Sequence, residues 1–257
     1  MARSEEPDSY LIEFMAEDGL DPMVVTKDTL VNYQLAQGKI LADSEVRDLL
    51  FQDEVQKAFN KAAVYLAGAM RTIKQVRQHL RDKGYDPSVV SAAVEKLIQK
   101  GYLDDRQFAR SFIQTELKTT NHGPLQIQRL LRSKGVEEEI IEEAFRDFPA
   151  DEEISRAVHL AMKWVEKKPG FSVGQIKADL QSMLLRKGYT NEAIRVAVEE
   201  SLKNLDDNHD EKAIQIIGEK ALKKYVSYPP EEQRNRVKSY LLRKGFSATL
   251  INEFLKE

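Results

Sequence analysis

The sequence predicts a mainly α-helical protein of tandem three-helix repeats that form an elongated, curved array, with a small N-terminal β-hairpin region. From Ser44 onward, apolar residues recur at three- and four-residue intervals and almost no strand pattern remains. A short phrase also recurs at intervals of about fifty residues, a period that suits a unit of three helices. It reads LRDKGY at 80–85, LRSKGV at 131–136, LLRKGY at 184–189 and LLRKGF at 241–246.

The N-terminal region differs from the rest in pattern and in charge. SYLIEF at 9–14 and DPMVVT at 21–26 are rich in strand-forming residues, and the intervening AEDGL at 16–20 carries an Asp-Gly turn signal, so a hairpin is expected. Residues 1–60 hold 5 basic and 13 acidic side chains, against 39 and 42 in the whole chain. The remainder is therefore net basic, although the chain as a whole carries a net charge of −3.

The helical periodicity divides the chain into four units of three predicted helices each. We expect domain boundaries at 1–53 for the hairpin and acidic region, then 54–102, 103–149, 150–205 and 206–257 for repeats 1 to 4. The expected helices are 54–68, 72–83 and 87–100; 104–118, 124–134 and 137–147; 151–167, 173–187 and 190–204; and 209–225, 230–244 and 247–256.

The recurring phrase has the properties of a helix C-terminal cap. Glycine just past a helix takes the left-handed conformation at little cost, the preceding lysine meets the negative end of the helix dipole, and the next residue packs back on the leucine. LIQKGY at 97–102 ends a third helix of a unit in the same way, so the phrase is mainly architectural. Asp104 and Gln107 are expected to start the next helix. The predicted contacts are Tyr85 with Leu80, Val136 with Leu131, Tyr189 with Leu184 and Phe246 with Leu241.

The middle helices carry more basic residues than capping requires, on the side opposite the apolar stripe. In the first unit, Ile73, Val76 and Leu80 share one stripe, and the basic residues are spaced to share the other. A solvated face explains any single helix, but four such helices suit phosphates or an acidic protein groove. The candidate partner- or DNA-binding residues are Arg71, Lys74, Arg77, Arg81, Lys83, Arg129, Arg132, Lys134, Lys177, Arg186, Lys187, Arg236, Lys238, Arg243 and Lys244.

Other classes of function find little support in the sequence. Zero cysteines leave neither disulfides nor cysteine-ligated zinc, and the acidic start and the short apolar run AAVYLAGAM at 62–70 indicate neither export nor membrane insertion. A cytoplasmic protein without cofactor or metal is expected. DDNHD at 206–210 lacks the later ligands of a calcium loop, because Glu211 and Ile217 replace the glycine and glutamate, and a helix N-cap cluster is favoured. The histidines His79, His122, His159 and His209 share no spacing, so no catalytic site is predicted.

Two longer segments extend this pattern to a known family. RTIKQVRQHLRDKGYDPSVVSAAVEKLIQKGYLDDRQFARSFI, followed by GPLQIQRLLRSKGVEEEIIEEAF, resembles the RecX family of bacterial recombinase regulators over about residues 61–148. The likeness includes YLDD with Phe108 and Ala109, and the pair Gly123-Pro124. Over 149–257 it weakens to the LLRKG phrase and to NLDD at 204–207.

The resemblance implies a non-enzymatic regulator of RecA. Members are similar tandem three-helix proteins that bind along the groove of the RecA filament on single-stranded DNA. They limit filament extension or promote disassembly, and so depress ATPase, strand exchange and coprotease activity in recombination, DNA repair and the SOS response. By this resemblance we expect a monomer with the RecA filament as partner, and some members also contact single- or double-stranded DNA.

Two other functions remain open from the residues alone. A helix-turn-helix DNA-binding protein also uses three short helices, but a net basic chain and a base-reading recognition helix would be expected. A generic helical-repeat scaffold that binds peptides would show a 34-residue period, which is absent here. Steep loss of binding to bare DNA with rising salt would favour the first of these.

Overall fold

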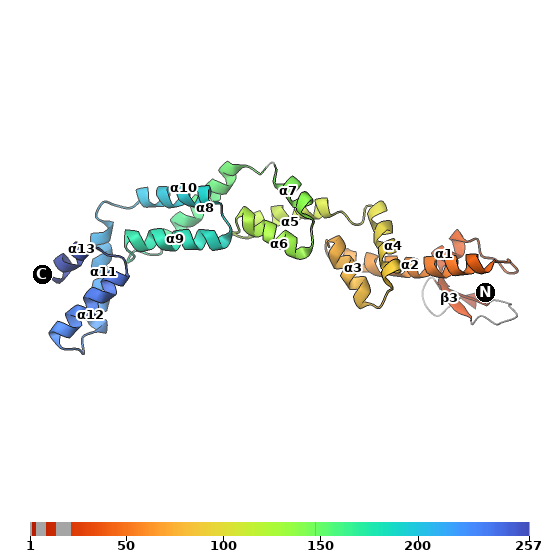
Figure 1. Cartoon of the computed structure of the whole chain (residues 1–257), viewed down its shortest axis with the longest axis horizontal. Helices are drawn as coiled ribbons and strands as arrows, with labels where there is room; N and C mark the ends of the chain where they lie inside the picture. The colour runs from red at the N-terminus through yellow and green to blue at the C-terminus, as the bar shows by residue number, and fades with distance from the viewer. Residues whose placement is uncertain (1, 4–8, 14–21, 147, 257) are drawn as a thin grey trace. The chain divides into compact units, whose positions relative to one another are not determined.

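The computed structural model describes residues 2–3, 9–13, 22–146 and 148–256, and it confirms the mainly helical fold class. Two compact units appear, Met1–Ser111 with Leu131–Glu142, and Phe112–Leu130 with Glu143–Glu257. Figure 1 shows the succession of elements. The helices are α1 Lys27–Asn32, α2 Asp43–Ala67, α3 Ile73–Asp82, α4 Pro87–Gln99, α5 Asp105–Thr119, α6 Pro124–Lys134, α7 Glu138–Phe145, α8 Ala150–Val165, α9 Val173–Lys187, α10 Asn191–Lys203, α11 His209–Lys224, α12 Pro230–Arg243 and α13 Ala248–Leu255.

The N-terminal strands form a three-stranded antiparallel sheet in the order β1-β2-β3. β2 (Ser9–Ile12) pairs with β3 (Met23–Thr26), with Tyr10 opposite Val25, which confirms the predicted strand pair. The expected Asp-Gly turn at 16–20 lies outside the described residues. β1 (Ala2–Arg3) and the helix α1 were not anticipated.

A buried carboxylate ties this sheet to α2. Asp53 is 2 % exposed, and its Oδ1 accepts hydrogen bonds from the backbone N–H of Thr26 at 2.7 Å and from the Thr26 hydroxyl at 3.0 Å. Its other oxygen pairs with Lys57 at 3.0 Å. Because α2 is one helix of 25 residues, the boundary expected between residues 53 and 54 falls inside it. The domain boundaries drawn from the sequence stay a prediction.

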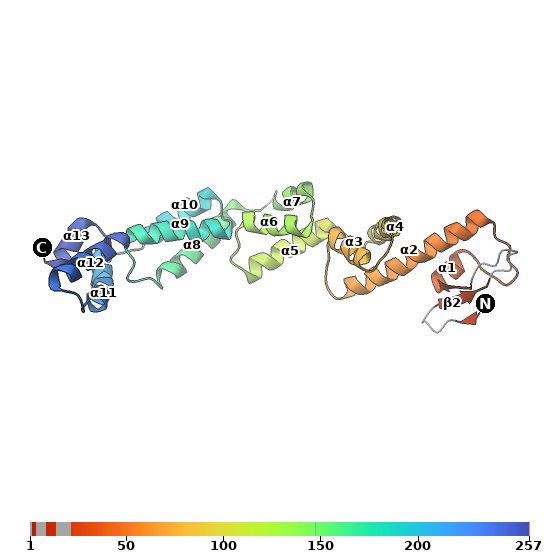
Figure 2. The same cartoon turned by 60° about the horizontal axis from the view of Figure 1, so that its bottom comes forward.

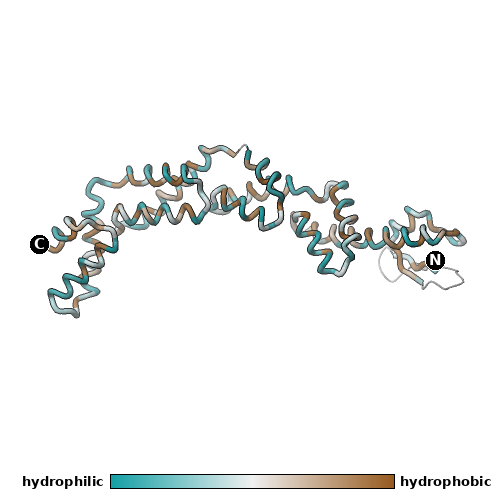
Figure 3. Tube along the Cα trace, in the orientation of Figure 1, coloured by the Kyte–Doolittle hydropathy of each residue, from teal (hydrophilic) through white to brown (hydrophobic). Residues whose placement is uncertain are grey.

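We call α2–α4 module 1, α5–α7 module 2, α8–α10 module 3 and α11–α13 module 4. In module 3, α8, α9 and α10 pack against one another around a core that includes Leu180, Leu184 and Ile194 (Figure 2). Hydrophobic and hydrophilic residues alternate along these helices (Figure 3), as one-sided packing requires. In the described part of the chain, no helix is both long and apolar enough to cross a membrane.

The capping prediction is confirmed at every repeat of the phrase. The glycines have positive φ angles, for example +85° at Gly84 and +80° at Gly188. The residue after each glycine donates its backbone N–H to the carbonyl of the leucine five positions earlier, as in Tyr85 to Leu80 at 3.3 Å and Tyr189 to Leu184 at 3.2 Å. These are the bonds of a Schellman cap.

Three of these helix ends do more than stop a helix, because each docks on the first turn of an earlier middle helix. In the first unit, the end of α6 meets the start of α3, where the Thr72 hydroxyl donates to the Lys134 carbonyl at 2.8 Å. In the second unit, the end of α12 meets the start of α9, where the Ser172 hydroxyl donates to the Lys244 carbonyl at 2.7 Å. We call each such contact a joint.

The third joint, also in the second unit, uses backbone groups alone. The N–H of Gly123 donates to the Lys187 carbonyl at 2.8 Å, and the N–H of Leu125 donates to the Gly188 carbonyl at 3.0 Å. In every joint, a carbonyl at a helix C-terminus accepts a hydrogen bond from the start of another helix. The donor is a side-chain hydroxyl in two joints and backbone N–H groups in the third. The negative end of one helix dipole thereby lies next to the positive end of the other.

Two joints carry an additional carboxylate from the start of the next module. The N–H of Ile73 donates to Asp105 Oδ1 at 3.0 Å, and the N–H of Val173 donates to Asp210 Oδ1 at 2.8 Å. Asp210 belongs to the DDNHD cluster, which lies at the start of α11 as expected, with Asn208 as the N-cap residue. The Asn208 side chain makes no capping hydrogen bond, and the Asp210 carboxylate accepts from the start of α9 in the preceding module. The joint at Gly123 has no counterpart for this bond because the equivalent first helical residue is Pro124, which lacks an N–H.

Of the two joint carboxylates, Asp105 is buried, whereas Asp210 is only half-buried. Burial raises the pKa of its carboxyl, the hydrogen bond from Ile73 lowers it, and the carboxylates of Glu137 and Asp104 raise it again, for a net upward shift. The folded protein therefore binds more protons at this site than the unfolded chain in the window above the ordinary aspartate pKa. The contribution of this group to stability is largest at low pH and declines as pH rises through the folded pKa.

Substitution of Gly188 by alanine should destabilise the protein more than the same change at Gly84. Both glycines have positive φ, so each change carries a strain of about 1–2 kcal/mol. A Cβ at Gly188 would also lie 2.6 Å from the Gln126 Cβ and closer still to the Gln126 backbone nitrogen, whereas one at Gly84 would meet no described atom within 4 Å. Urea unfolding of G84A and G188A measures the difference, and equal losses would contradict a docking role for Gly188.

Asp105→Asn should be at least as stable as the parent at pH 7, because the amide oxygen still accepts from Ile73 and no buried charge remains. Asp105→Ala leaves the Ile73 N–H without this partner and should cost about 1 kcal/mol. Urea unfolding at pH 5 and pH 7 tests both, and D105N should lack the extra stability that the parent gains from this group on acidification. A D105N variant as unstable as D105A would rule out this account.

Candidate partner-binding surface

The basic residues of α3 form a short exposed face opposite the core. Arg77 and Arg81 lie four residues apart, so they project from the same side of the helix, while Val76 and Leu80 are fully buried. Arg77, Arg81 and Lys83 are exposed, and none forms an ion pair within the described residues. These cations are available to a partner.

Two basic residues next to this face, Arg71 and Lys74, contact other residues of the first unit. The helix starts after Thr72, whose hydroxyl accepts from the Gln75 N–H, so Arg71 precedes the helix and is not part of the helical stripe that was expected. Its guanidinium carbon lies 4.8 Å from the centre of the Tyr65 ring, and its Nε is buried. The exposed Lys74 runs its aliphatic stem against Gly135 at the joint.

The basic residues of α6 are partly neutralised by neighbours. Arg132 pairs with Glu138, with Nε 2.6 Å from Oε2 and Nη2 2.5 Å from Oε1, and this pairing lowers the pKa of the Glu138 carboxyl. The exposed Arg129 reaches Gln126 Oε1 at 3.4 Å. Lys134 is half-buried, and its carbonyl accepts from Thr72 in the joint.

The basic residues of α9 do not share a face. Lys177 and Arg186 are nine residues apart, which at 100° per residue places them on opposite sides of the helix. Lys177 lines a groove between α9 and α10 with Leu185 and Arg195, whereas Arg186 lines a different cleft that also includes Lys187. Lys177 and Arg186 therefore do not form a single basic stripe along this helix.

The basic residues of α12 gather beside aromatic rings. The guanidinium carbon of Arg236 lies 4.0 Å from the centre of the Tyr228 ring, and Arg236 also pairs with Glu232 at 2.7 Å. Lys244 lies 5.7 Å from the Phe171 ring centre. Arg243 is exposed without an ion pair in the described residues, and Lys238 is half-buried.

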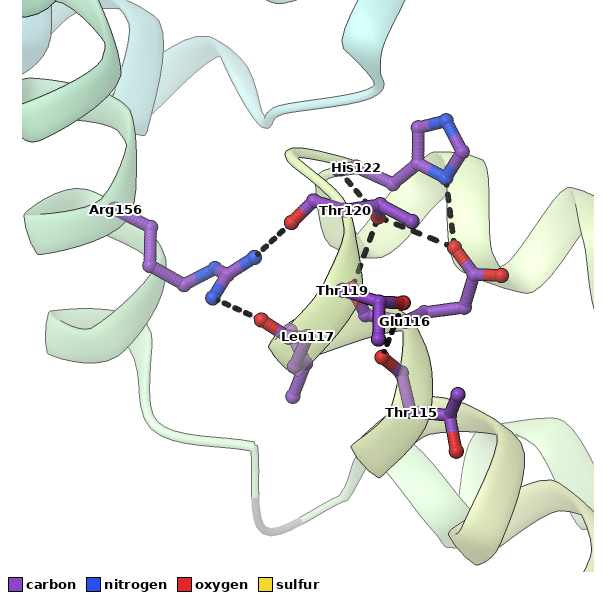
Figure 4. Close-up of polar contacts among 7 residues, drawn as sticks. All are labelled: Thr115, Glu116, Leu117, Thr119, Thr120, His122 and Arg156. Carbon is purple, nitrogen blue, oxygen red and sulfur yellow. Dashed lines mark hydrogen bonds and ion pairs between the residues drawn. The ribbon is translucent and has the colours of Figure 1, made fainter.

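A further cation that the sequence did not single out holds α5 and α8 together. Arg156 of α8 donates to the carbonyl of Leu117 at 2.7 Å and to that of Thr120 at 3.1 Å, which satisfies the C-terminal end of α5 (Figure 4). Beside it, His122 Nδ1 lies 2.8 Å from Glu116 Oε2. Arg156 belongs to no repeated phrase, so only the tertiary contact reveals its role.

The histidines have local contacts rather than a shared site. The His79 ring stacks on Tyr65 with centres 4.0 Å apart, His209 Nε2 lies 3.0 Å from the Phe171 carbonyl, and His159 is exposed. Among the described residues, no cluster of three His, Asp or Glu side chains is arranged to hold a metal ion. The described surface does present exposed cations, among them Arg77, Arg81 and Arg243.

These features define a class of helical proteins made of jointed three-helix modules with basic residues on the middle helices. Models of three RecX domains match the chain: the first three-helix domain at 58–105, the second at 104–144 and the third at 209–255. The chain belongs to the RecX family. Because the third matched segment falls in module 4, module 3 stands between the second and third matched segments.

Individual relatives agree with this assignment over most of the chain. Regulatory protein RecX of Bacillus licheniformis is 36% identical over 233 residues, covering 91% of this chain and 89% of the relative. That of Bacillus subtilis is 34% identical, covering 91% and 88%. A crystal structure of regulatory protein RecX has a TM-score of 0.66 at 24% identity, covering 74% of this chain and 94% of the other, and supports the fold. RecX from Lactobacillus salivarius has a TM-score of 0.56 at 27% identity, covering 58% and 97%.

Proposed function

We propose that this chain is a non-enzymatic regulator that binds, as a monomer, in the groove of the RecA filament on single-stranded DNA and lowers RecA activity. The activities depressed are filament extension, ATPase, strand exchange and coprotease function, and through them recombination, DNA repair and the SOS response. The proposal rests on membership of a family whose members are named regulatory proteins.

The structural observation that best supports this proposal concerns the exposed arginines of α3. Arg77 and Arg81 stand exposed and unpaired, among the described residues, on a helix whose opposite side is fully buried. An acidic protein groove or a phosphate backbone would complement such cations, and a filament on DNA offers both. Because a filament repeats its protomers, a protein with several similar modules is suited to contact several of them.

The direct test is a titration of this protein into RecA with single-stranded DNA, with ATP hydrolysis and strand exchange as readouts. A dose-dependent fall in both activities is expected. A protein that binds bare DNA tightly at physiological salt and leaves both RecA activities unchanged would contradict the proposal.

The double substitution Arg77→Glu with Arg81→Glu should weaken inhibition of the RecA ATPase by about tenfold or more, because two attractive contacts become repulsive. Unfolding should be nearly unchanged, since both side chains are exposed. Arg71 is left intact because it packs on Tyr65.

The matched control is Lys163→Glu with Lys167→Glu. These exposed lysines are also four residues apart and lie at the end of α8 rather than on a middle helix. The control changes the net charge equally and should inhibit as the parent does. If the α3 variant is folded and inhibits as strongly as the control, the α3 face is not the contact.

A further inference from the structure

A groove between α9 and α10 gives module 3 a surface of a different chemistry from the basic face of module 1. Figures 1 and 2 both show these two helices side by side, and the groove between them has a volume of about 570 Å³. All of its lining residues belong to the second unit.

One row of side chains from each helix lines the groove. Within a row the residues are four apart, so they project from the same side of the helix over two turns, or about 12 Å. The α9 row is Lys177, Gln181 and Leu185, and the α10 row is Ile194, Val198 and Leu202. Ile194 and Val198 belong to the core of module 3 and form an apolar floor, whereas Leu185 is 56% exposed.

The leucine at the groove replaces an arginine of module 1. Leu185 lies three residues before the cap glycine of α9, and Arg81 lies three residues before that of α3. Four residues earlier, α9 has Gln181 where α3 has Arg77. Module 1 folds with arginine at the first of these positions, so the packing of three helices does not require a leucine there. The exchange instead suits this side of α9 to an apolar ligand.

The charges around the groove leave one cation free. On α10, Arg195 pairs with Glu192 at 2.7 Å and with Glu199 at 3.3 Å, so these charges offset one another. On α9, Lys177 is exposed and forms no ion pair with any residue that the structure describes. A ligand with an apolar face and one carboxylate beside it would complement this arrangement.

We propose that this groove binds an amphipathic helix of a protein partner, with apolar side chains on successive turns against the α10 row and Leu185, and a carboxylate at Lys177. A helix satisfies its own backbone N–H and C=O groups, which an extended segment would leave unpaired over Ile194 and Val198. Apolar anchors one turn apart are how amphipathic helices fill hydrophobic grooves.

A nucleic acid fits this groove less well than a helix does. Among the described residues that line it, none has an aromatic ring on which a base could stack. Leu185 and the apolar floor gain nothing from phosphates. The proposal goes beyond the proposed function, because it assigns module 3 a protein ligand whose binding requires neither DNA nor the basic faces.

The test uses the full chain and two labelled helix-forming peptides of about 20 residues. Both carry leucines on successive turns of one face; the acidic peptide has a glutamate beside the first leucine, and the basic peptide has a lysine there. By fluorescence anisotropy, the parent should bind the acidic peptide about tenfold more tightly than the basic one. Lys177→Glu should reverse this preference.

Leu185→Gln should weaken binding of both peptides by about tenfold, because it removes the apolar contact without adding charge. The matched control is Leu242→Gln, which changes the leucine of α12 that also lies three residues before a cap glycine and is 48% exposed. The control should bind both peptides as the parent does. Circular dichroism and urea unfolding establish that each variant is folded.

Four outcomes would overturn the proposal. They are the absence of saturable binding of the acidic peptide, equal affinities in folded L185Q and L242Q, an unreversed preference in K177E, and displacement of the peptide by stoichiometric oligo-dT. Sedimentation of the protein alone addresses the remaining occupant. A parent that self-associates while L185Q stays monomeric would assign the groove to a second copy of this chain.

Discussion

The docking of one middle-helix end on the start of an earlier one is the contact on which the architecture depends. A helix ends with carbonyls that have no intrahelical partner and begins with N–H groups in the same condition. At one joint these two sets of groups meet directly, in the bonds from Gly123 to Lys187 and from Leu125 to Gly188. At the other two, the hydroxyls of Thr72 and Ser172 supply the donor. Each module thereby satisfies polar groups that its own three helices leave open.

The joints also explain why the recurring phrase is so restricted in sequence. The glycine provides the left-handed cap and, at the docked ends, the space for close approach, since a side chain at Gly188 would collide with Gln126. At Gly84 only the first requirement holds. The docked helix ends contact one another and are not accessible to a partner. The solvent-exposed sides of the middle helices are accessible, and Arg77 and Arg81 lie on such a side.

Much of the fold could be predicted because it is encoded locally. The helices at 124–134 and 173–187 begin and end at the expected residues, since proline or serine starts and glycine ends are short-range signals. The joints could not be predicted, because nothing near Asp210 in the sequence shows that it accepts from Val173. The surface was predicted less well than the fold: Arg71 and Arg132 have partners that the helical spacing did not reveal.

The hydrogen bonds of the joint restrict which helix starts can receive a docked helix end. An incoming cap needs a hydroxyl or a backbone N–H at the receiving helix start, such as Thr72, Ser172 or Gly123 supplies. α12 starts with Pro229 and Pro230, which supply neither. The start of α12 therefore differs chemically from the starts of α3, α6 and α9, and it would be a poorer receiver for an incoming helix end.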